Sequence, residues 1–125
     1  MSKEINTIKI NEVEYVRKDS LKSNETAKSF KGMKYVIVRT YSAGVFAGYL
    51  KERNGQEVKL ESARRLWQWS GAASLSQLAM EGTSKPKSCK FPCEVERIEL
   101  LQAIEIIDCT EQARLSIASV EVWKA

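Results

Sequence analysis

Two arginines and two tryptophans lie close together in the middle of this chain. Arg64 and Arg65 precede Trp67 and Trp69, and a run of small residues follows at positions 70–74. An arginine side chain is a planar fork that matches phosphate, and an indole is a flat surface on which a nucleobase can stack. Small residues allow the backbone to approach a bound group closely. The spacing therefore predicts a binding site for a ring that carries phosphate, with affinity rather than catalysis as its function.

The residue inventory argues against an enzyme. The chain contains no histidine, so the usual general base for a serine or cysteine nucleophile is missing. It also lacks the G-x-x-x-x-G-K-[ST] loop of ATP-hydrolysing proteins. We predict a protein without catalytic residues and without a cofactor.

Cysteine spacing raises one metal hypothesis. Cys89 and Cys93 can supply two zinc ligands, and Cys109 is the only further soft ligand in the chain. A mononuclear site would then need a carboxylate or water, so free thiols are the favoured alternative. We expect no metal site.

The tryptophan pair has two interpretations. If the strand before it continues, Arg65, Trp67 and Trp69 share one face, because side chains two positions apart point the same way. One guanidinium would then lie beside two indoles. If the segment is irregular or helical, this alignment is lost, and at least one indole packs in the core or at an interface.

A basic loop downstream offers further ligand contacts. Residues 83–92 carry Lys85, Lys87 and Lys90 around a single aromatic side chain, Phe91. Lysine attracts phosphate while the ring stacks on a base. A phenylalanine before proline is equally typical of a plug that closes the core, and both interpretations stay open.

A short helix is predicted between these two groups. Ser74 is its N-cap, Gln77 completes a capping box, and Gly82 ends a helix over residues 75–81. The free amides at its start are a natural seat for a phosphate. Close packing of the small residues 70–74 is the alternative.

Composition places these groups in a small globular protein. The chain has 125 residues, of which 43% are hydrophobic and 29% charged, and its mean hydropathy is −0.35. No apolar run is long enough to span a membrane, and the first residues lack the apolar core of a signal peptide, so we expect a cytosolic protein. The net charge of +4 is compatible with an anionic partner.

The predicted fold class is α+β, an antiparallel sheet meander with two short helices. Asn54 and Gly55 form the strongest hairpin signal, and Thr110 caps the second helix. Residues 33–125 form the ligand-binding domain, and residues 1–32 form an N-terminal extension. The expected elements are a short hairpin over 8–17, a linker or short helix over 18–32, strands over 33–41, 45–53 and 56–62, strands within 93–109, a helix over 111–119 and a last strand over 120–123.

The central block also carries a family resemblance. Residues 64–83 and the later Cys89-Lys90-Phe91-Pro92 are similar to the Thoeris anti-defence 1 family, and the similarity runs from about Lys34 to Trp123. The family consists of phage proteins that sequester the cyclic ADP-ribose isomers made by bacterial TIR-domain immune proteins. The resemblance implies a non-enzymatic sponge that binds glycocyclic ADP-ribose intact and releases it only on unfolding.

The resemblance also implies a cellular context. It implies a homo-oligomer, either a dimer or a hexamer, that acts in the cytoplasm of the infected bacterial host. A membrane partner and a nucleic-acid partner are not expected. Some members hold cyclic oligonucleotides at separate, symmetry-related sites.

The same resemblance assigns roles to individual residues. Phe91 is the stacking candidate, and Arg39 and Arg114 are the diphosphate candidates. Arg64 and Arg65 are the cations for a cyclic oligonucleotide near an oligomer axis. The full set of expected ligand-binding residues is Phe91, Arg114, Arg39, Trp67, Trp69 and Lys90.

Two other classes of protein are alternatives. A small phage nucleic-acid-binding or regulatory protein would use the same basic and aromatic residues, and its binding would weaken steeply with salt. The chain has no recognisable helix-turn-helix and only a modest charge, so this alternative ranks lower. A structural virion component would assemble without ligand, which sedimentation would reveal.

Overall fold

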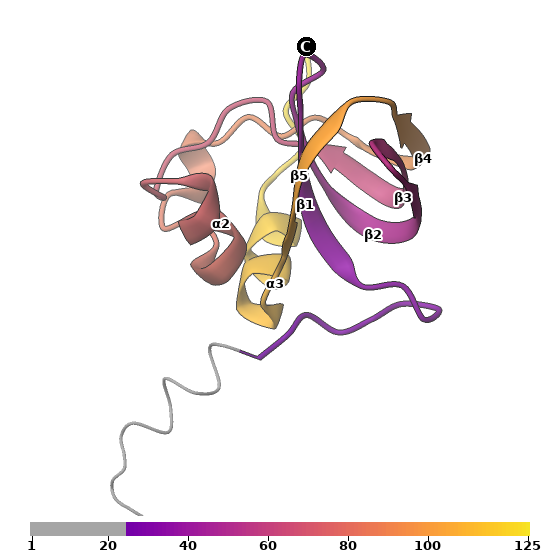
Figure 1. The fold of residues 1–125 in the computed structure, drawn as a ribbon. Helices are drawn as coiled ribbons and strands as arrows, with labels where there is room; N and C mark the ends of the chain where they lie inside the picture. The colour runs from indigo at the N-terminus through magenta and orange to yellow at the C-terminus, as the bar shows by residue number, and fades with distance from the viewer. Residues whose placement is uncertain (1–24) are drawn as a thin grey trace, which may run out of the picture.

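A computed structural model describes residues 25–125 of the protein, which form one antiparallel sheet with two α-helices (Figure 1). The strands lie in the order β4-β3-β2-β1-β5. This arrangement confirms the predicted α+β meander with two short helices. The elements are β1 (Tyr35–Thr40), β2 (Val45–Asn54), β3 (Glu57–Arg65), α2 (Leu75–Glu81), the 3₁₀ turn η1 (Pro86–Ser88), β4 (Glu94–Leu100), β5 (Ala103–Asp108) and α3 (Glu111–Ser119).

The sheet curls because its two edge strands are joined directly. β4 and β5 follow each other in the chain but lie at opposite edges, with only residues 101–102 between them. The two edges therefore approach each other at this end, where Ala103 N of β5 donates to Gln56 O, in the turn between β2 and β3, at 3.0 Å. The inner face of the curled sheet encloses an aliphatic core around one phenylalanine. Its buried members are Val36, Val38, Phe46, Val58, Leu60, Ala63, Leu100 and Ala103.

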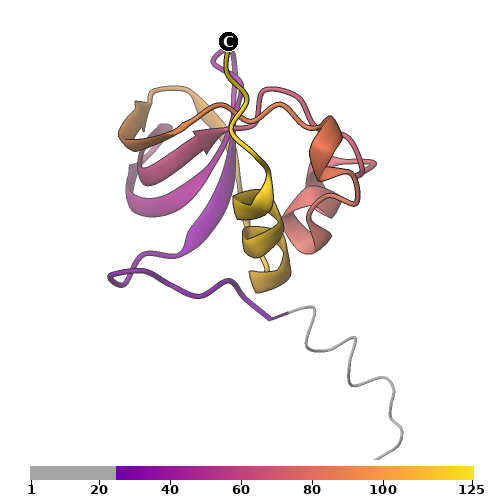
Figure 2. The same cartoon turned by 180° about the vertical axis from the view of Figure 1, so that it is seen from behind.

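The opposite face of the sheet carries both α-helices (Figures 1 and 2). Tyr35 and Ile37 of β1 project to this side, while Val36 and Val38 project into the inner core. Both faces of β1 are therefore covered, which explains its run of four buried residues. The helices contribute a second apolar cluster, the helix-side core. It includes Leu66, Leu78, Ala79, Cys89, Phe91, Cys109, Ala113, Ile117 and Val120.

Both helices begin and end where their capping residues predict. Ser74 Oγ accepts a hydrogen bond from Gln77 N at 3.1 Å, and the cap at Gly82 donates to Leu78 O. Thr110 Oγ1 accepts from Ala113 N at 3.1 Å and begins α3. Among residues 25–125, neither helix is long and apolar enough to cross a membrane.

The strand predictions need three corrections. β3 extends to Arg65, three residues past the predicted end. Asn54 pairs with Glu57, so the two turn residues are Gly55 and Gln56, and only Gly55 has a positive φ, of +64°. The expected last strand over 120–123 is absent, since that segment makes a single bridge, from Val122 to Phe91.

The described part of the N-terminal extension packs on α3. Thr26 bridges Thr110, and the buried Ala27 donates its amide to Cys109 O at 2.9 Å. Residues 25–27 therefore belong to the folded unit. The predicted hairpin over residues 8–17 lies outside the described residues.

Candidate functional site

Arg64 is a buried structural cation. Its side chain donates three hydrogen bonds to backbone carbonyls: Nε to Pro92 O at 3.0 Å, Nη1 to Ile117 O at 2.9 Å and Nη2 to Phe91 O at 3.1 Å. The residue is only 7% exposed, and this burial lowers the pKa of the guanidinium from its usual value. Arg64 therefore ties the loop before β4 to the end of α3, and its fork is not available to phosphate.

Arg65 points to the other face of the sheet. Its Cζ lies 4.4 Å from the centre of the Phe46 ring, and Nη1 donates to Ala43 O. The structure therefore does not bring Arg64 and Arg65 together, as the predicted common site for a cyclic oligonucleotide requires. Adjacent residues of a strand face opposite ways, so the two guanidinium groups are separated by the sheet.

A bulge decides which arginine is buried. Simple alternation from Val58 and Leu60 would place Arg64 on the inner face. Ser62 instead has a φ of +51°, and the register between β2 and β3 shifts at this point. Ala63 then joins the inner core, and Arg64 turns toward the helix-side core.

Phe91 is a core residue. It is 0% exposed and packs in the helix-side core, with Arg64 Cζ 5.5 Å from its ring centre. The plug interpretation is confirmed. The stacking role expected for Phe91 is wrong for this structure, because no face of the ring is open to a ligand.

Trp67 and Lys90 meet at the surface, together with a residue that the sequence analysis did not select. Trp67 and Trp123 are stacked, with ring planes 6° apart and ring centres 6.5 Å apart. Lys90 Nζ lies 5.6 Å from the centre of the Trp123 ring. The two indoles are 62% and 45% exposed. We call Trp67, Lys90 and Trp123 the aromatic platform.

The other selected residues do not join the platform. Trp69 is half-buried against the helix-side core, so the strand-like alignment of Trp67 with Trp69 is wrong. Arg39 lies on β1 and pairs with Glu105, with Nε and Oε1 2.9 Å apart. The start of α2 is closed by side chains, since Gln77 Oε1 accepts from Ala73 N at 2.7 Å. The amides of Ala73 and Gln77, at the predicted phosphate site, are therefore already hydrogen-bonded.

Arg114 borders a hollow beside α3. The hollow has a volume of about 280 Å³, and Tyr35 and Tyr49 from the sheet face it. We call it the α3 hollow. Its lining consists of Tyr35, Tyr49, Arg64, Glu94, Arg114, Ile117, Ala118, Val120 and Val122.

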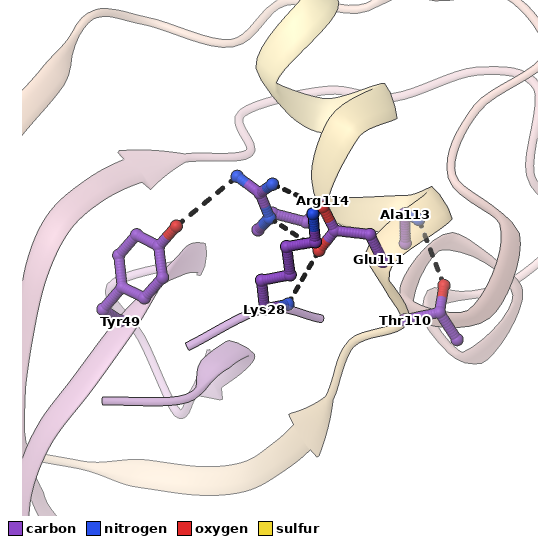
Figure 3. Close-up of polar contacts among 6 residues, drawn as sticks. All are labelled: Lys28, Tyr49, Thr110, Glu111, Ala113 and Arg114. Atoms are coloured by element: carbon purple, nitrogen blue, oxygen red, sulfur yellow. Dashed lines mark hydrogen bonds and ion pairs between the residues drawn. The ribbon is translucent and has the colours of Figure 1, made fainter. Parts of the chain in front are cut away.

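Arg114 is held in place by a polar network (Figure 3). Its Nε and Nη2 donate to the two carboxylate oxygens of Glu111, at 2.9 and 2.5 Å, and Nη1 reaches Tyr49 Oη at 3.5 Å. The Lys28 amide also donates to Glu111 Oε1, at 2.7 Å. Glu111 therefore links the N-terminal segment, α3 and the arginine that faces the hollow.

The network and the burial around it shift the pKa values of these side chains. Hydrogen bonds from Arg114 and from the Lys28 amide lower the pKa of Glu111 to about 2. The same ion pair raises the pKa of Arg114. Burial raises the pKa of the Tyr35 hydroxyl, which lines the hollow, so Tyr35 stays protonated and neutral.

The site residues that the sequence analysis missed are Trp123, Tyr49 and Glu111. Trp123 carried no local signal, because its stacking partner Trp67 lies far away in the chain. Glu111 and Arg114 stand three positions apart on a predicted helix, a spacing at which opposite charges pair. Among residues 25–125, no cluster of three potential metal ligands occurs.

Comparison with known proteins yields one match. Residues 33–117 match the family model described as "Domain of unknown function (DUF6948)". No curated protein and no solved structure matches the chain.

Proposed function

We propose that this chain, which belongs to the DUF6948 family, binds a cyclic nucleotide signal and sequesters it without degrading it. The proposed ligand is glycocyclic ADP-ribose or a related cyclic ADP-ribose isomer. The proposal rests on the resemblance of residues 64–83 and 89–92 to the Thoeris anti-defence 1 family. On this proposal the protein is a phage anti-defence factor in the cytoplasm of the infected host.

The α3 hollow is the observation that carries the proposal. Ligand sites are concave, largely apolar and supplied with a few placed polar groups, and the hollow combines these features. Arg114 lines the hollow with a guanidinium that also pairs with Glu111, and Tyr35 and Tyr49 supply aromatic walls. The apolar side chains of Ile117 and Val120 form the remainder of the wall.

The size of the hollow favours an oligomeric sponge. About 280 Å³ lies just below the usual range for small-molecule sites, and a ligand with two phosphates and a base needs more room. A second copy of the chain that closes over the hollow would supply it. The proposed active species is therefore a dimer or hexamer.

The capture experiment tests this function directly. Purified protein is incubated with glycocyclic ADP-ribose and filtered, and the ligand left in the filtrate is measured by chromatography. We expect depletion of the ligand, followed by its full recovery in unchanged form after heat denaturation. Recovery of a hydrolysed product, or no depletion, would contradict the proposal.

A variant pair ties capture to the hollow. Arg114→Ala should weaken capture by about 1 to 3 kcal/mol, the usual cost of losing a charge-assisted contact. Lys28→Ala is the matched control, because Lys28 contacts the same network through its backbone amide, which the substitution keeps. Equal capture by Arg114→Ala and the control would remove Arg114 from the site.

A further inference from the structure

We propose that the aromatic platform is a second binding site, separate from the α3 hollow, for a planar ring that carries a phosphate group. The ring stacks on the exposed indole surface, and Lys90 meets the phosphate. This site goes beyond the proposed function, because it requires neither Arg114 nor the network at Glu111. Trp123 becomes a ligand-binding residue.

The exposure of the two indoles is the first argument. Tryptophan is strongly buried on average, and large apolar side chains that gather at a surface mark sites of interaction. Trp67 is 62% exposed and Trp123 45% exposed, and the two are neighbours. Two indoles side by side in water present flat surface that a planar ligand can cover.

The geometry of the pair leaves that surface usable. The ring planes are 6° apart, so both indoles present parallel faces. Their centres are 6.5 Å apart, whereas atoms in contact lie about 3.5 to 4 Å apart. The rings therefore cover each other only in part, and each keeps area for stacking.

The positive charge of Lys90 beside the indoles favours a negatively charged ligand. Lys90 Nζ lies 5.6 Å from the centre of the Trp123 ring, and Lys90 forms no ion pair with any other residue of 25–125. Lys85 and Lys87 stand in the same loop. A cation that forms no ion pair within residues 25–125, beside a stacking surface, favours a ligand that brings both a ring and a negative charge.

The base of the platform is built to hold the indoles in place. Gln68 and Lys90 exchange two backbone hydrogen bonds, at 3.2 and 2.7 Å, and Trp123 N donates to Phe91 O at 3.0 Å. The buried Arg64 also donates to Phe91 O. Three distant segments are thus tied together directly below the exposed rings, which lowers the entropy lost when a ligand binds.

The shared ligand chemistry is a nucleobase with its phosphate, and it has two sources. Free nucleotides supply it, and so do the bases of single-stranded nucleic acid. The experiment separates them. Binding of the full-length protein is measured by calorimetry and by quenching of tryptophan fluorescence, with AMP, adenosine, ribose 5-phosphate and a short oligodeoxynucleotide as probes.

We expect AMP to bind more tightly than adenosine, and ribose 5-phosphate not to bind. Trp67→Ala should weaken AMP binding about 5- to 150-fold, the range that corresponds to loss of one stacked base. Lys90→Gln should bring the affinities of AMP and adenosine together while stacking persists. If the oligonucleotide binds more tightly than AMP, and its affinity falls steeply with salt, single-stranded nucleic acid is the source of the base that binds the platform.

Leu115→Ala is the matched control, because Leu115 is an exposed apolar residue on α3 and lies in neither the platform nor the hollow. Unchanged AMP binding in both Trp67→Ala and Trp123→Ala overturns the proposal. A second result also overturns it: the wild-type protein is an oligomer that does not bind AMP, and both substitutions dissociate it. The indoles would then form a contact between copies of the chain. The AMP experiment and the capture of glycocyclic ADP-ribose measure different sites. A negative result in one therefore leaves the other proposal standing.

Discussion

The guanidinium of Arg64 lies against the ring of Phe91, with Cζ 5.5 Å from the ring centre, and donates to the Phe91 carbonyl oxygen at 3.1 Å. Both side chains are buried. Two residues that resemble ligand contacts in the sequence therefore hold each other in the core. Through the Phe91 carbonyl, which also accepts from Trp123 N, they support the aromatic platform from below.

Substitution of the two adjacent arginines should have unequal effects. Arg64→Met removes three buried hydrogen bonds, including the one to Pro92 O, and should lower the free energy of unfolding by about 2 to 4 kcal/mol. Arg65→Met removes one hydrogen bond and a partly exposed contact with Phe46, at a cost of about 1 kcal/mol. Urea denaturation of the two variants measures the difference. Equal losses would show that Arg64 is not the structural cation.

Substitution of Phe91 should lower the stability of the fold without a direct effect on ligand binding. Phe91→Ala leaves a cavity in the helix-side core and should cost about 3 to 5 kcal/mol, whereas Phe91→Leu fills most of the volume and should cost less. We expect Phe91→Leu to capture ligand as well as the wild-type protein at a temperature where it is folded. Impaired capture by a folded Phe91→Leu would restore the stacking role.

Glu111 should make the protein sensitive to acid. Its pKa of about 2 in the folded protein lies below its usual value of 4.5, so its ionised form stabilises the fold. That contribution is complete above pH 4.5 and is lost as the pH falls toward 2. Glu111→Gln should therefore be less stable than wild type at pH 7, and the difference should narrow between pH 4.5 and pH 2. Thermal unfolding over this range checks it, and a constant difference would contradict the role of the carboxylate.

Gly82 should tolerate no side chain. Its φ is +80°, and an added Cβ would overlap Ser116 Cβ, so alanine would force α2 and α3 apart. Gly55 is the control, because its φ is +64° and no atom lies within 4 Å of an added Cβ. Both substitutions incur a backbone cost of about 1 kcal/mol, and Gly82→Ala should cost about 1 to 3 kcal/mol more. Melting temperatures that fall equally would contradict the close approach of the helices.

The three thiols should react at different rates. Cys93 is exposed, whereas Cys89 and Cys109 are buried, and burial raises the pKa of the Cys109 thiol to about 12. Only the thiolate reacts, so at pH 8 an aromatic disulfide reagent should modify one thiol of the folded protein quickly and all three in denaturant. Cys93→Ser should abolish the fast phase, and a fast phase that persists would show that a buried thiol is accessible.

The sequence by itself determined the parts of the fold that depend on near neighbours. The limits of α2 and α3 follow from Ser74 and Thr110, whose side chains bond the first turn of each helix. The fold class follows from strands that alternate along the chain and a hairpin at Gly55. These features depend on contacts within a few residues, which patterns in the sequence record.

The tertiary structure alone decided which candidate residues form a site. The bulge at Ser62 turned Arg64 into the core and left Arg65 on the opposite face, although the two are identical and adjacent. The partner of Trp67 is Trp123, at the far end of the chain. Side-chain direction after a bulge and the meeting of distant segments both depend on long-range pairing and packing, which no local pattern of residues specifies.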